Sequence, residues 1–498
     1  MNATEETPID PVLERVKTGI EAFDDLVMGG LPRGRTTIVG GTPGSGKTVF
    51  ATQFLAHGIT DLDEPGVFVT FEESPAEIEV NMASFGWDIR RWRETNRLAF
   101  VDASPRDSDQ VVVGDFDLAG LLARILHAAK NANAKRIVLD SITQLFDHFV
   151  TDEKAVRREL LRIATALKKD GLTVLMTAER NREYGDISRH RIEEFVADNV
   201  VILRNALDRE RRRRTIEVLK MRGSRHVEGE VPITLISEQG MVAVPLSSLR
   251  LEQQSSSKRV TSGNAELDEM TSGGFFRDSV TLVSGATGTG KTLLVTNFMA
   301  GGVEAGERAL LVGYEESRGQ LFRNARSWGV DFEVMEAEGR LKVVCLYPEA
   351  QSLPDHLLMI RQLVEEFKPD RIAIDSLSAL ERIAPETGFR EFLISLTSFI
   401  KKREIAGLCT ATDKSLIGGH SASEQHISTL TDSIILLRYI QQAEFMHRGL
   451  MVLKMRGSEH DKQIRRFTID GNGMHLGQPL EDAPDVFGGS TATQSSSL

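Results

Sequence analysis

The sequence predicts an α/β protein of two duplicated lobes, each built on a mostly parallel sheet with helices on both faces. Three observations predict this class. A glycine-rich motif of one pattern occurs twice, short apolar segments alternate with helical stretches, and further segments repeat in register. Apolar strands that alternate with helices are typical of parallel sheets buried on both faces.

The glycine-rich motif fits G-x-x-x-x-G-K-[ST] at residues 41–48 and again at 285–292. A β-branched segment precedes each copy, and a helix-compatible run follows. In this context the glycines let backbone N–H groups surround phosphate oxygens, the lysine reaches the terminal phosphates, and the threonine is a Mg²⁺ ligand. The motif predicts two sites for ATP and Mg²⁺. The expected binding residues are Gly44, Ser45, Gly46, Lys47 and Thr48, and in the second copy Thr287, Gly288, Thr289, Gly290, Lys291 and Thr292.

The predicted elements of the first lobe place this motif in the sheet. Predicted strands are 36–39, 67–70, 136–139, 172–177 and 200–203, and predicted helices include 118–129 and 154–169. The phosphate-binding loop then follows the carboxyl end of a strand. Ligands of open α/β sheets bind at that edge.

The internal repeat sets the expected domain boundaries. The motif recurs 244 residues later, and Lys220-Met-Arg-Gly-Ser recurs as Lys454-Met-Arg-Gly-Ser at an offset of 234. We therefore expect an N-terminal extension (1–14), a first lobe (15–247), a linker (248–258), a second lobe (259–476) and a short tail (477–498).

Composition narrows the class of protein. The chain is 41% hydrophobic and 27% charged, which is ordinary for a soluble domain, and its net charge is −12. An acidic balance argues against a non-specific nucleic-acid binder. Two cysteines, Cys345 and Cys409, give no disulfide framework or metal cluster. With no signal-peptide core and no apolar run of membrane-spanning length, we expect a cytoplasmic location.

Acidic residues recur at matching places in both lobes. Asp140 and Asp375 each end an apolar strand, where a carboxylate can hold Mg²⁺ or can simply cap the strand. The pairs Glu72-Glu73 and Glu315-Glu316 follow the preceding strand, 31 and 30 residues after the first motif glycine. Adjacent acids are common on solvated loops, but their recurrence favours a catalytic role, which is to orient and deprotonate a water or hydroxyl.

Basic residues near the end of each lobe offer a second catalytic element. Lys220, Arg222, Lys454 and Arg456 could bind their own lobe, lie on a solvated hairpin, or neutralise charge on a neighbouring subunit's phosphates. The run 211–214, four arginines, is interpreted as a hairpin end or an interface cluster rather than a DNA contact.

Together with the segment 426–432, these motifs resemble the KaiC family of circadian clock ATPases, which are double-lobed members of the RecA/DnaB-like superfamily. The resemblance runs from about Arg15 to Gly473. It implies a homohexamer of two stacked rings with ATP between subunits. The N-terminal ring would be a slow ATPase, and the C-terminal ring an autokinase and autophosphatase.

The resemblance also implies residue roles. Ser428 and Thr429 match the phosphorylated positions, Glu315 the general base, Glu316 its neighbour, and Arg382 an arginine near the phosphosites. Expected nucleotide contacts are Ser84, Lys220, Met221, Arg222, Ser224 and His226 in the first lobe, and Trp328, Arg448, Lys454, Met455, Arg456, Gly457 and Ser458 in the second. The expected Mg²⁺ residues are Thr48, Asp140, Thr292, Glu315 and Asp375. At the repeat offset, Glu194 and Phe195 stand opposite Ser428 and Thr429, so only the second lobe offers hydroxyls there.

The segment 114–118 and the helix after it resemble the KaiC family, which is compatible with a KaiB-like partner on the first ring. Clock members of the family carry a longer tail that a KaiA-type activator binds, whereas only residues 478–498 remain here. Activation by such a partner is therefore doubtful. The competing interpretations are a DNA-translocating recombinase or helicase, which the acidic composition opposes, and a nucleotide-regulated scaffold.

Overall fold

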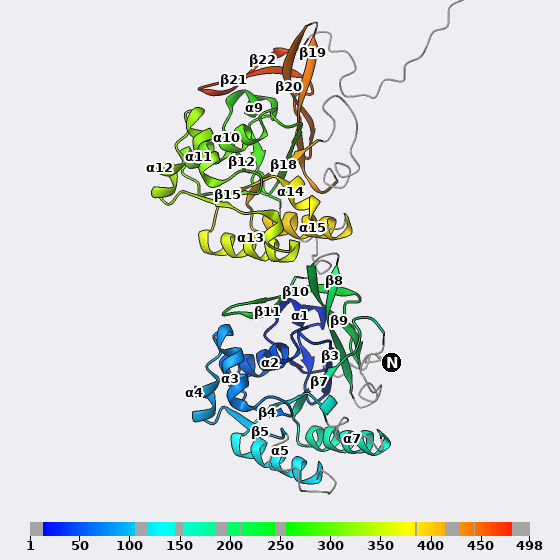
Figure 1. The fold of residues 1–498 in the computed structure, drawn as a ribbon. Helices are drawn as coiled ribbons and strands as arrows, with labels where there is room; N and C mark the ends of the chain where they lie inside the picture. Colours follow the sequence, from blue (N-terminus) through cyan, green and yellow to red (C-terminus); the bar gives the residue numbers. More distant parts are fainter. Residues whose placement is uncertain are drawn as a thin grey trace, which may run out of the picture. The chain divides into compact units, whose positions relative to one another are not determined.

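The computed structural model describes residues 13–104, 118–144, 153–185, 197–208, 211–244, 255–383, 386–413, 429–442 and 444–480. The chain divides into two compact units, Met1–Ser248 and Leu249–Leu498 (Figure 1). Each unit contains a two-stranded sheet and a nine-stranded sheet.

The first unit follows the order expected of an α/β lobe and ends in antiparallel strands. Its elements are β1 (Arg15–Val16), α1 (Glu21–Leu26), β2 (Leu31–Pro32), β3 (Thr36–Gly41), α2 (Lys47–Asp61), β4 (Gly66–Thr70), α3 (Pro75–Met82), η1 (Ala83–Phe85), α4 (Ile89–Glu94), β5 (Leu98–Asp102), α5 (Leu118–Ala132), β6 (Arg136–Asp140), α7 (Glu153–Lys169), β7 (Thr173–Glu179), β8 (Asn199–Asp208), β9 (Arg211–Met221), β10 (Glu230–Ile236) and β11 (Gly240–Ala243).

The large sheet of this unit has the order β11-β10-β9-β8-β3-β7-β6-β4-β5. The six strands from β8 to β5 run parallel, and β9, β10 and β11 are antiparallel. Gly41, the last residue of β3, pairs with Glu179 on one side and Leu203 on the other. The first phosphate-binding loop therefore leaves the middle of the sheet at its carboxyl edge.

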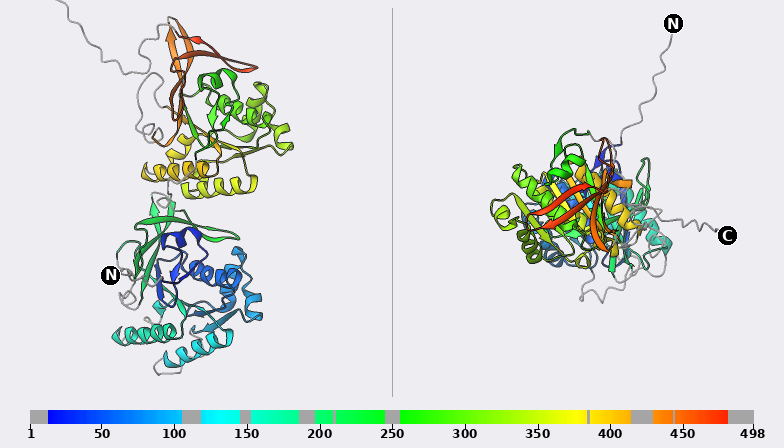
Figure 2. Two further views of the ribbon diagram at one scale, coloured as in Figure 1. Left: turned by 180° about the vertical axis from the view of Figure 1, so that it is seen from behind. Right: turned by 90° about the horizontal axis from the view of Figure 1, so that it is seen from above.

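Alternation along the strands builds a core on each face of the sheet. Val39 and Val138 pack with Phe54 of α2 in one apolar cluster. The adjacent residues of the same strands, Ile38 and Ile137, belong to a second cluster that contains α5 and α7. Successive side chains of a strand point to opposite faces, so this division places helices on both sides of the sheet (Figures 1 and 2).

The second unit repeats this plan. Its elements are β12 (Arg259–Val260), α9 (Ala265–Met270), β13 (Phe275–Phe276), β14 (Val280–Gly285), α10 (Lys291–Glu304), β15 (Ala309–Gly313), α11 (Arg318–Ser327), α12 (Phe332–Ala337), β16 (Leu341–Cys345), η3 (Pro348–Ala350), α13 (Leu353–Phe367), β17 (Arg371–Asp375), α14 (Leu377–Arg382), α15 (Glu386–Lys402), β18 (Ala406–Thr412), β19 (Ser433–Gln442), β20 (Phe445–Met455), β21 (Arg465–Asp470) and β22 (Gly473–Pro479). The large sheet has the order β16-β15-β17-β18-β14-β19-β20-β21-β22, which corresponds strand by strand to the first.

The predicted fold class is confirmed, and every predicted strand and helix of the first lobe is present. The sequence prediction missed the edge strand β5 and the antiparallel strands β9, β10 and β11. It also ended the strand at 203, whereas β8 continues to Asp208. In the second unit, β22 extends to Pro479 and so includes the first residues of the expected tail. The expected linker at 248–258 lies mostly outside the described residues.

Candidate functional site

Each phosphate-binding loop turns into a helix whose first N–H groups have no side-chain cap. Gly46 precedes α2 with φ 98°, and Gly290 precedes α10 with φ 108°, a region that favours glycine. The N-terminal N–H groups of an α-helix lack intrahelical acceptors and carry partial positive charge. Both loops therefore present the donors that a phosphate chain needs.

The motif lysines lie over these loops. Lys47 Nζ donates to the carbonyl oxygens of Gly41 at 3.0 Å and Thr42 at 3.3 Å. Lys291 Nζ donates to the matching carbonyls of Gly285 and Ala286 at 2.8 and 3.0 Å. Burial lowers the pKa of both lysines, although nearby carboxylates oppose this. An ammonium held in the curve of each loop fits a role on the terminal phosphates of a nucleotide.

The threonine after each lysine contacts the aspartate predicted to act with it. Thr292 Oγ1 donates to Asp375 Oδ2 at 2.8 Å, and Thr410 donates to the other carboxylate oxygen. In the first lobe, Asp140 accepts a hydrogen bond from Thr177, and the nearby Thr48 hydroxyl favours the charged form of the carboxylate. Burial raises the pKa of both aspartates, because it disfavours the charged form.

The described residues contain no cluster of three or more His, Cys, Asp or Glu side chains that could hold a metal by themselves. Mg²⁺ in nucleotide sites is usually bound by one or two protein groups together with phosphates and water. The pairs Thr48–Asp140 and Thr292–Asp375 supply such groups beside each loop, so the residues present fit a nucleotide-bound Mg²⁺.

The adjacent glutamates follow β4 and β15, next to the strands that carry the aspartates. Glu72 accepts from Gln144 Nε2 at 2.6 Å, and Glu315 accepts from Ser376 Oγ at 2.8 Å. Ser376 directly follows Asp375, across a cis peptide bond. Glu315 thus lies beside the predicted Mg²⁺ residues of the second lobe.

The second member of each pair points to a helix. Glu73 accepts from Asn81 of α3 at 3.2 Å, and Glu316 accepts from Asn324 of α11 at 2.8 Å. Burial raises the pKa of Glu316, and the negative charge of Asp375 adds to this effect. The two glutamates of the second lobe therefore have different surroundings, which favours different roles for them.

In each large sheet, the Lys-Met-Arg segment lies at the amino edge, where the parallel strands begin. The phosphate-binding loop lies at the carboxyl edge, where they end. Lys220 pairs with Val200, which in turn pairs with Ile38, three residues before Gly41. At about 3.3 Å per residue, Lys220 is roughly 10 Å from the loop along the strand direction alone. Its Nζ donates to Ala197 O at 2.9 Å, further toward the amino edge.

The second lobe shows the same arrangement. Lys454 Nζ donates to Thr431 O at 2.7 Å, and Arg456 donates to Thr429 O at 3.1 Å. Met455 pairs with Ser433, the first residue of β19. These cations are therefore not brought to the phosphate-binding loop of their own lobe.

The remaining predicted nucleotide contacts are spread over several elements. Ser224 and Ser458, which accept hydrogen bonds from Arg15 and Arg259, follow the Lys-Met-Arg segments, as do Gly457 and His226. Met221 and Met455 are buried. Ser84 lies in η1, Trp328 is the C-cap residue of α11, and Arg448 stacks over Tyr439 of β19.

Comparison with known proteins supports one family. The family model described as "ATPase: KaiC" matches residues 16–248 and again 260–481. The chain belongs to the KaiC family. It is 56% identical over 478 residues to circadian clock protein KaiC3 of Synechocystis sp., covering 96% of this chain and 94% of the relative. It is 51% identical over 478 residues to circadian clock oscillator protein KaiC of Synechococcus elongatus, covering 96% and 92%, and 50% identical over 477 residues to a Prochlorococcus marinus KaiC, covering 96% and 93%.

Membership of the KaiC ATPase family implies that both lobes bind and hydrolyse ATP. The resemblance inferred from the motifs is thereby confirmed. Of the two predicted phosphoacceptors, Thr429 is exposed beside Arg456, and Ser428 lies outside the described residues. Arg382 Nη1 lies 3.9 Å from Glu315 Oε1, and both side chains are exposed to solvent.

The sequence analysis did not identify two side chains that contact the first phosphate-binding loop. Arg214 Nε donates to Gly44 O at 3.1 Å, and Glu183 accepts from Thr42 Oγ1 at 2.6 Å. The repeat carried the signal for Arg214, because the offset of 234 aligns it with Arg448. The interpretation of the run 211–214 as only a hairpin end or interface cluster was incomplete, since Arg214 reaches the loop.

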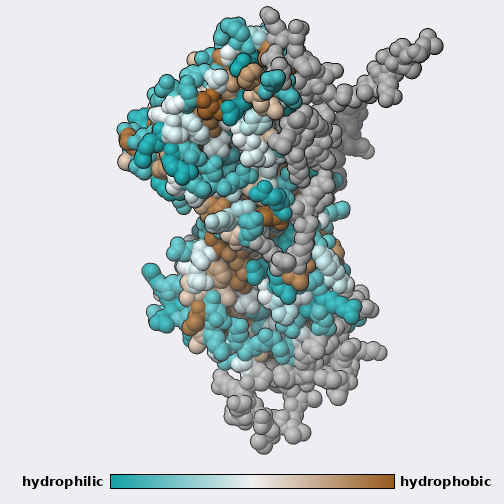
Figure 3. All heavy atoms as spheres, turned by 45° about the horizontal axis from the view of Figure 1, so that its top comes forward, coloured by the Kyte–Doolittle hydropathy of each residue, from teal (hydrophilic) through white to brown (hydrophobic). Residues whose placement is uncertain are grey.

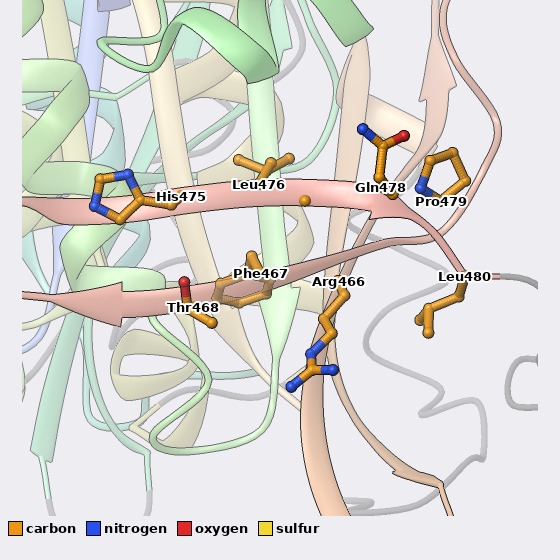
Figure 4. Close-up of a pocket in the computed structure, with 9 residues that line it drawn as sticks. Arg466, Phe467, Thr468, His475, Leu476, Gln478, Pro479 and Leu480 are labelled. Atoms are coloured by element: carbon orange, nitrogen blue, oxygen red, sulfur yellow. The ribbon is translucent and has the colours of Figure 1, made fainter.

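On the face seen in Figure 3, the coloured surface is mostly hydrophilic and carries some apolar patches. A groove of about 590 Å³ runs along β21 and β22 and is lined by residues 466–468 and 475–480 (Figure 4). Its lining is separate from the predicted nucleotide residues. Among the described residues, no helix is long and apolar enough to cross a membrane.

Proposed function

We propose that this chain is a hexameric KaiC-type ATPase whose second lobe is an autokinase and autophosphatase acting on Ser428 and Thr429. The first lobe hydrolyses ATP with Glu72 and Glu73 at its active site. The names of the relatives support a role in circadian timekeeping or a related signalling system, with a KaiB-like protein as a candidate partner on the first lobe.

One observation carries the kinase proposal. The backbone oxygen of Thr429 accepts from Arg456, so this acceptor lies at the sheet edge that also carries Lys454. That edge is opposite the phosphate-binding loop of the same lobe. If Lys454 and Arg456 bind the terminal phosphates of ATP held by a neighbouring subunit, Thr429 lies close to the γ-phosphate of that ATP.

The transfer reaction then follows from the residues of two subunits. The hydroxyl oxygen of the acceptor attacks the γ-phosphorus, its proton passes to Glu315, and the bond to the β-phosphate oxygen breaks to leave ADP. Thr292 and Asp375 would hold Mg²⁺, which neutralises phosphate charge when bound. Lys291 binds the phosphates from its own subunit, and Lys454 and Arg456 bind them from the neighbour.

A complementation experiment tests transfer between subunits. One variant, Lys291→Ala, keeps both acceptors but loses the second-lobe lysine. The other, Ser428→Ala with Thr429→Ala, keeps the loop but loses the acceptors. Incubated alone with Mg-ATP, neither variant should gain phosphate, whereas in mixed assemblies the Lys291→Ala chain should become phosphorylated, as intact mass resolves.

Two results would contradict the proposal. Wild-type chain that gains no phosphate in the peptide 426–432 would leave a plain ATPase. Wild-type labelling without labelling of the Lys291→Ala chain in mixtures would place the transfer within one subunit.

A further inference from the structure

A polar pair lies buried behind the carboxylates of the second lobe. Tyr314 is the first residue after β15 and directly precedes Glu315, and His356 is the fourth residue of α13. Their exposed fractions are 5% and 0%. The rings meet edge to face with centroids 5.1 Å apart, and Tyr314 Oη lies 3.3 Å from His356 Nδ1.

The partners of the imidazole fix the direction of these hydrogen bonds. His356 Nε2 lies 3.0 Å from the carbonyl oxygen of Pro348, which can only accept, so Nε2 carries a proton. In the neutral ring Nδ1 is then the acceptor, and the phenol donates to it. Burial raises the pKa of Tyr314, which keeps the phenol protonated and able to donate.

The first lobe has an apolar pair at the same place. Phe71 follows β4 as Tyr314 follows β15, and its backbone N–H donates to Asp140 O at 3.0 Å, as that of Tyr314 donates to Asp375 O at 2.7 Å. Leu121 is the fourth residue of α5, as His356 is of α13. Phe71 and Leu121 are buried in one apolar cluster, so the first lobe fills this space without a polar pair.

The pair joins the carboxylate segment to two other elements of the second lobe. Pro348 begins η3, after the edge strand β16, and His356 belongs to α13. The backbone N–H of Tyr314 contacts Asp375, while its side chain is held by His356. Rotation or displacement of Tyr314 would therefore move Glu315 relative to Asp375.

We propose that Tyr314 and His356 are positioning residues that hold Glu315 and Glu316 for the reaction of the second lobe. This rests on the proposed roles of these glutamates, but it holds whether the γ-phosphate passes to water or to a protein hydroxyl. In either case the proton of the attacking oxygen goes to Glu315 and ADP leaves. Neither Tyr314 nor His356 takes up a proton in this step.

Paired substitutions separate positioning from packing. Tyr314→Phe removes the hydroxyl that donates to the buried Nδ1, and His356→Leu removes the ring nitrogen that accepts from the buried phenol, so each single variant should lose thermal stability. The double variant, Tyr314→Phe with His356→Leu, recreates the apolar pair of the first lobe and should recover that stability. If Tyr314 and His356 position the glutamates, the second-lobe kcat of all three variants should be about tenfold below that of the parent. Their KM for ATP should stay within about twofold of the parental value.

The assay measures total Mg-ATP turnover in a Lys47→Ala background, which silences the first lobe, and phosphate on the peptide 426–432 in parallel. Tyr347→Phe, which removes a hydroxyl from a tyrosine that is 81% exposed, is the matched control and should leave kcat unchanged. A double variant that regains parental kcat would show that the pair only packs, and so would overturn the inference. A parent that turns over ATP without labelling the peptide would refute the kinase proposal alone, whereas a parent without second-lobe turnover would refute both.

Discussion

The contact between Thr292 and Asp375 gives a quantitative prediction for Mg-ATP binding. Replacing Thr292 by valine removes a hydroxyl that lies 2.8 Å from a buried carboxylate and that we assign to Mg²⁺. Valine nearly conserves the volume and the helix position, so the change is confined to the polar group. Thr296, one turn later in α10, donates to the carbonyl of Thr292 at 2.9 Å and provides a matched control.

The magnitude follows from the charge of the partner. A hydrogen bond to a charged group contributes about 1.5–3 kcal/mol, compared with about 1 kcal/mol for a neutral pair. If the hydroxyl acts on the Mg²⁺ shell, Thr292→Val should weaken second-lobe affinity for Mg-ATP by roughly 10- to 150-fold, since about 1.4 kcal/mol is a factor of ten. The helical contact of Thr296 is local, and Thr296→Val should change affinity less than about threefold.

Calorimetric titration with ATP in the Lys47→Ala background measures this affinity, once with Mg²⁺ and once with a chelator. The Thr292→Val loss should appear with Mg²⁺ and largely vanish with the chelator. An equal loss under both conditions would mean that the substitution distorts the loop. No loss in either would refute the assignment of this hydroxyl.

Three further predictions address turnover, assembly and packing. Glu72→Gln with Glu73→Gln should remove much of the steady-state ATP hydrolysis but leave second-lobe phosphorylation, and an unchanged hydrolysis rate would contradict the first-lobe assignment. Light scattering should report a larger particle with Mg-ATP than without it, because a nucleotide held between subunits stabilises the assembly by mass action; a chain that stays monomeric at saturating ATP would contradict the ring. Gly302→Ala should destabilise the protein by about 1–3 kcal/mol in chemical denaturation, because an added Cβ would lie 2.2 Å from Arg371 Nε. Gly319→Ala is the control, since its Cβ would meet no atom within 4 Å, and it should stabilise α11 by about 0.4–1 kcal/mol.

Much of the fold was predictable because its signals are local. The strand before each loop, the positive φ of Gly46 and Gly290, and the helix that follows are all encoded within about a dozen residues. The duplication made the prediction stronger, since each strand of one large sheet has a counterpart in the other. The antiparallel strands β9, β10 and β11 were missed because their pairing depends on long-range register, which short segments do not specify.

The candidate site was predictable where a residue type alone limits the chemistry. Lys291, Thr292 and Asp375 were predicted to act together, and the structure brings them together. Arg214 was missed because arginines on a hairpin are usually solvated, and only the fold brings one of them to Gly44. Ser428 lies outside the described residues, so its role stays a prediction.

Comparison of the two lobes indicates which residues could divide hydrolysis and transfer between them under the proposed function. Both lobes keep the loop lysine, the threonine–aspartate contact and the adjacent glutamates, so both can activate ATP. They differ in what surrounds this shared set. In the first lobe Arg214 and Glu183 contact the phosphate-binding loop, while in the second a hydroxyl residue, Thr429, lies beside Arg456. Since the common residues cannot decide whether water or a side chain receives the phosphate, we expect the proposed division of hydrolysis and transfer to depend on residues outside the shared motifs. Substitutions there should change the acceptor without abolishing ATP binding.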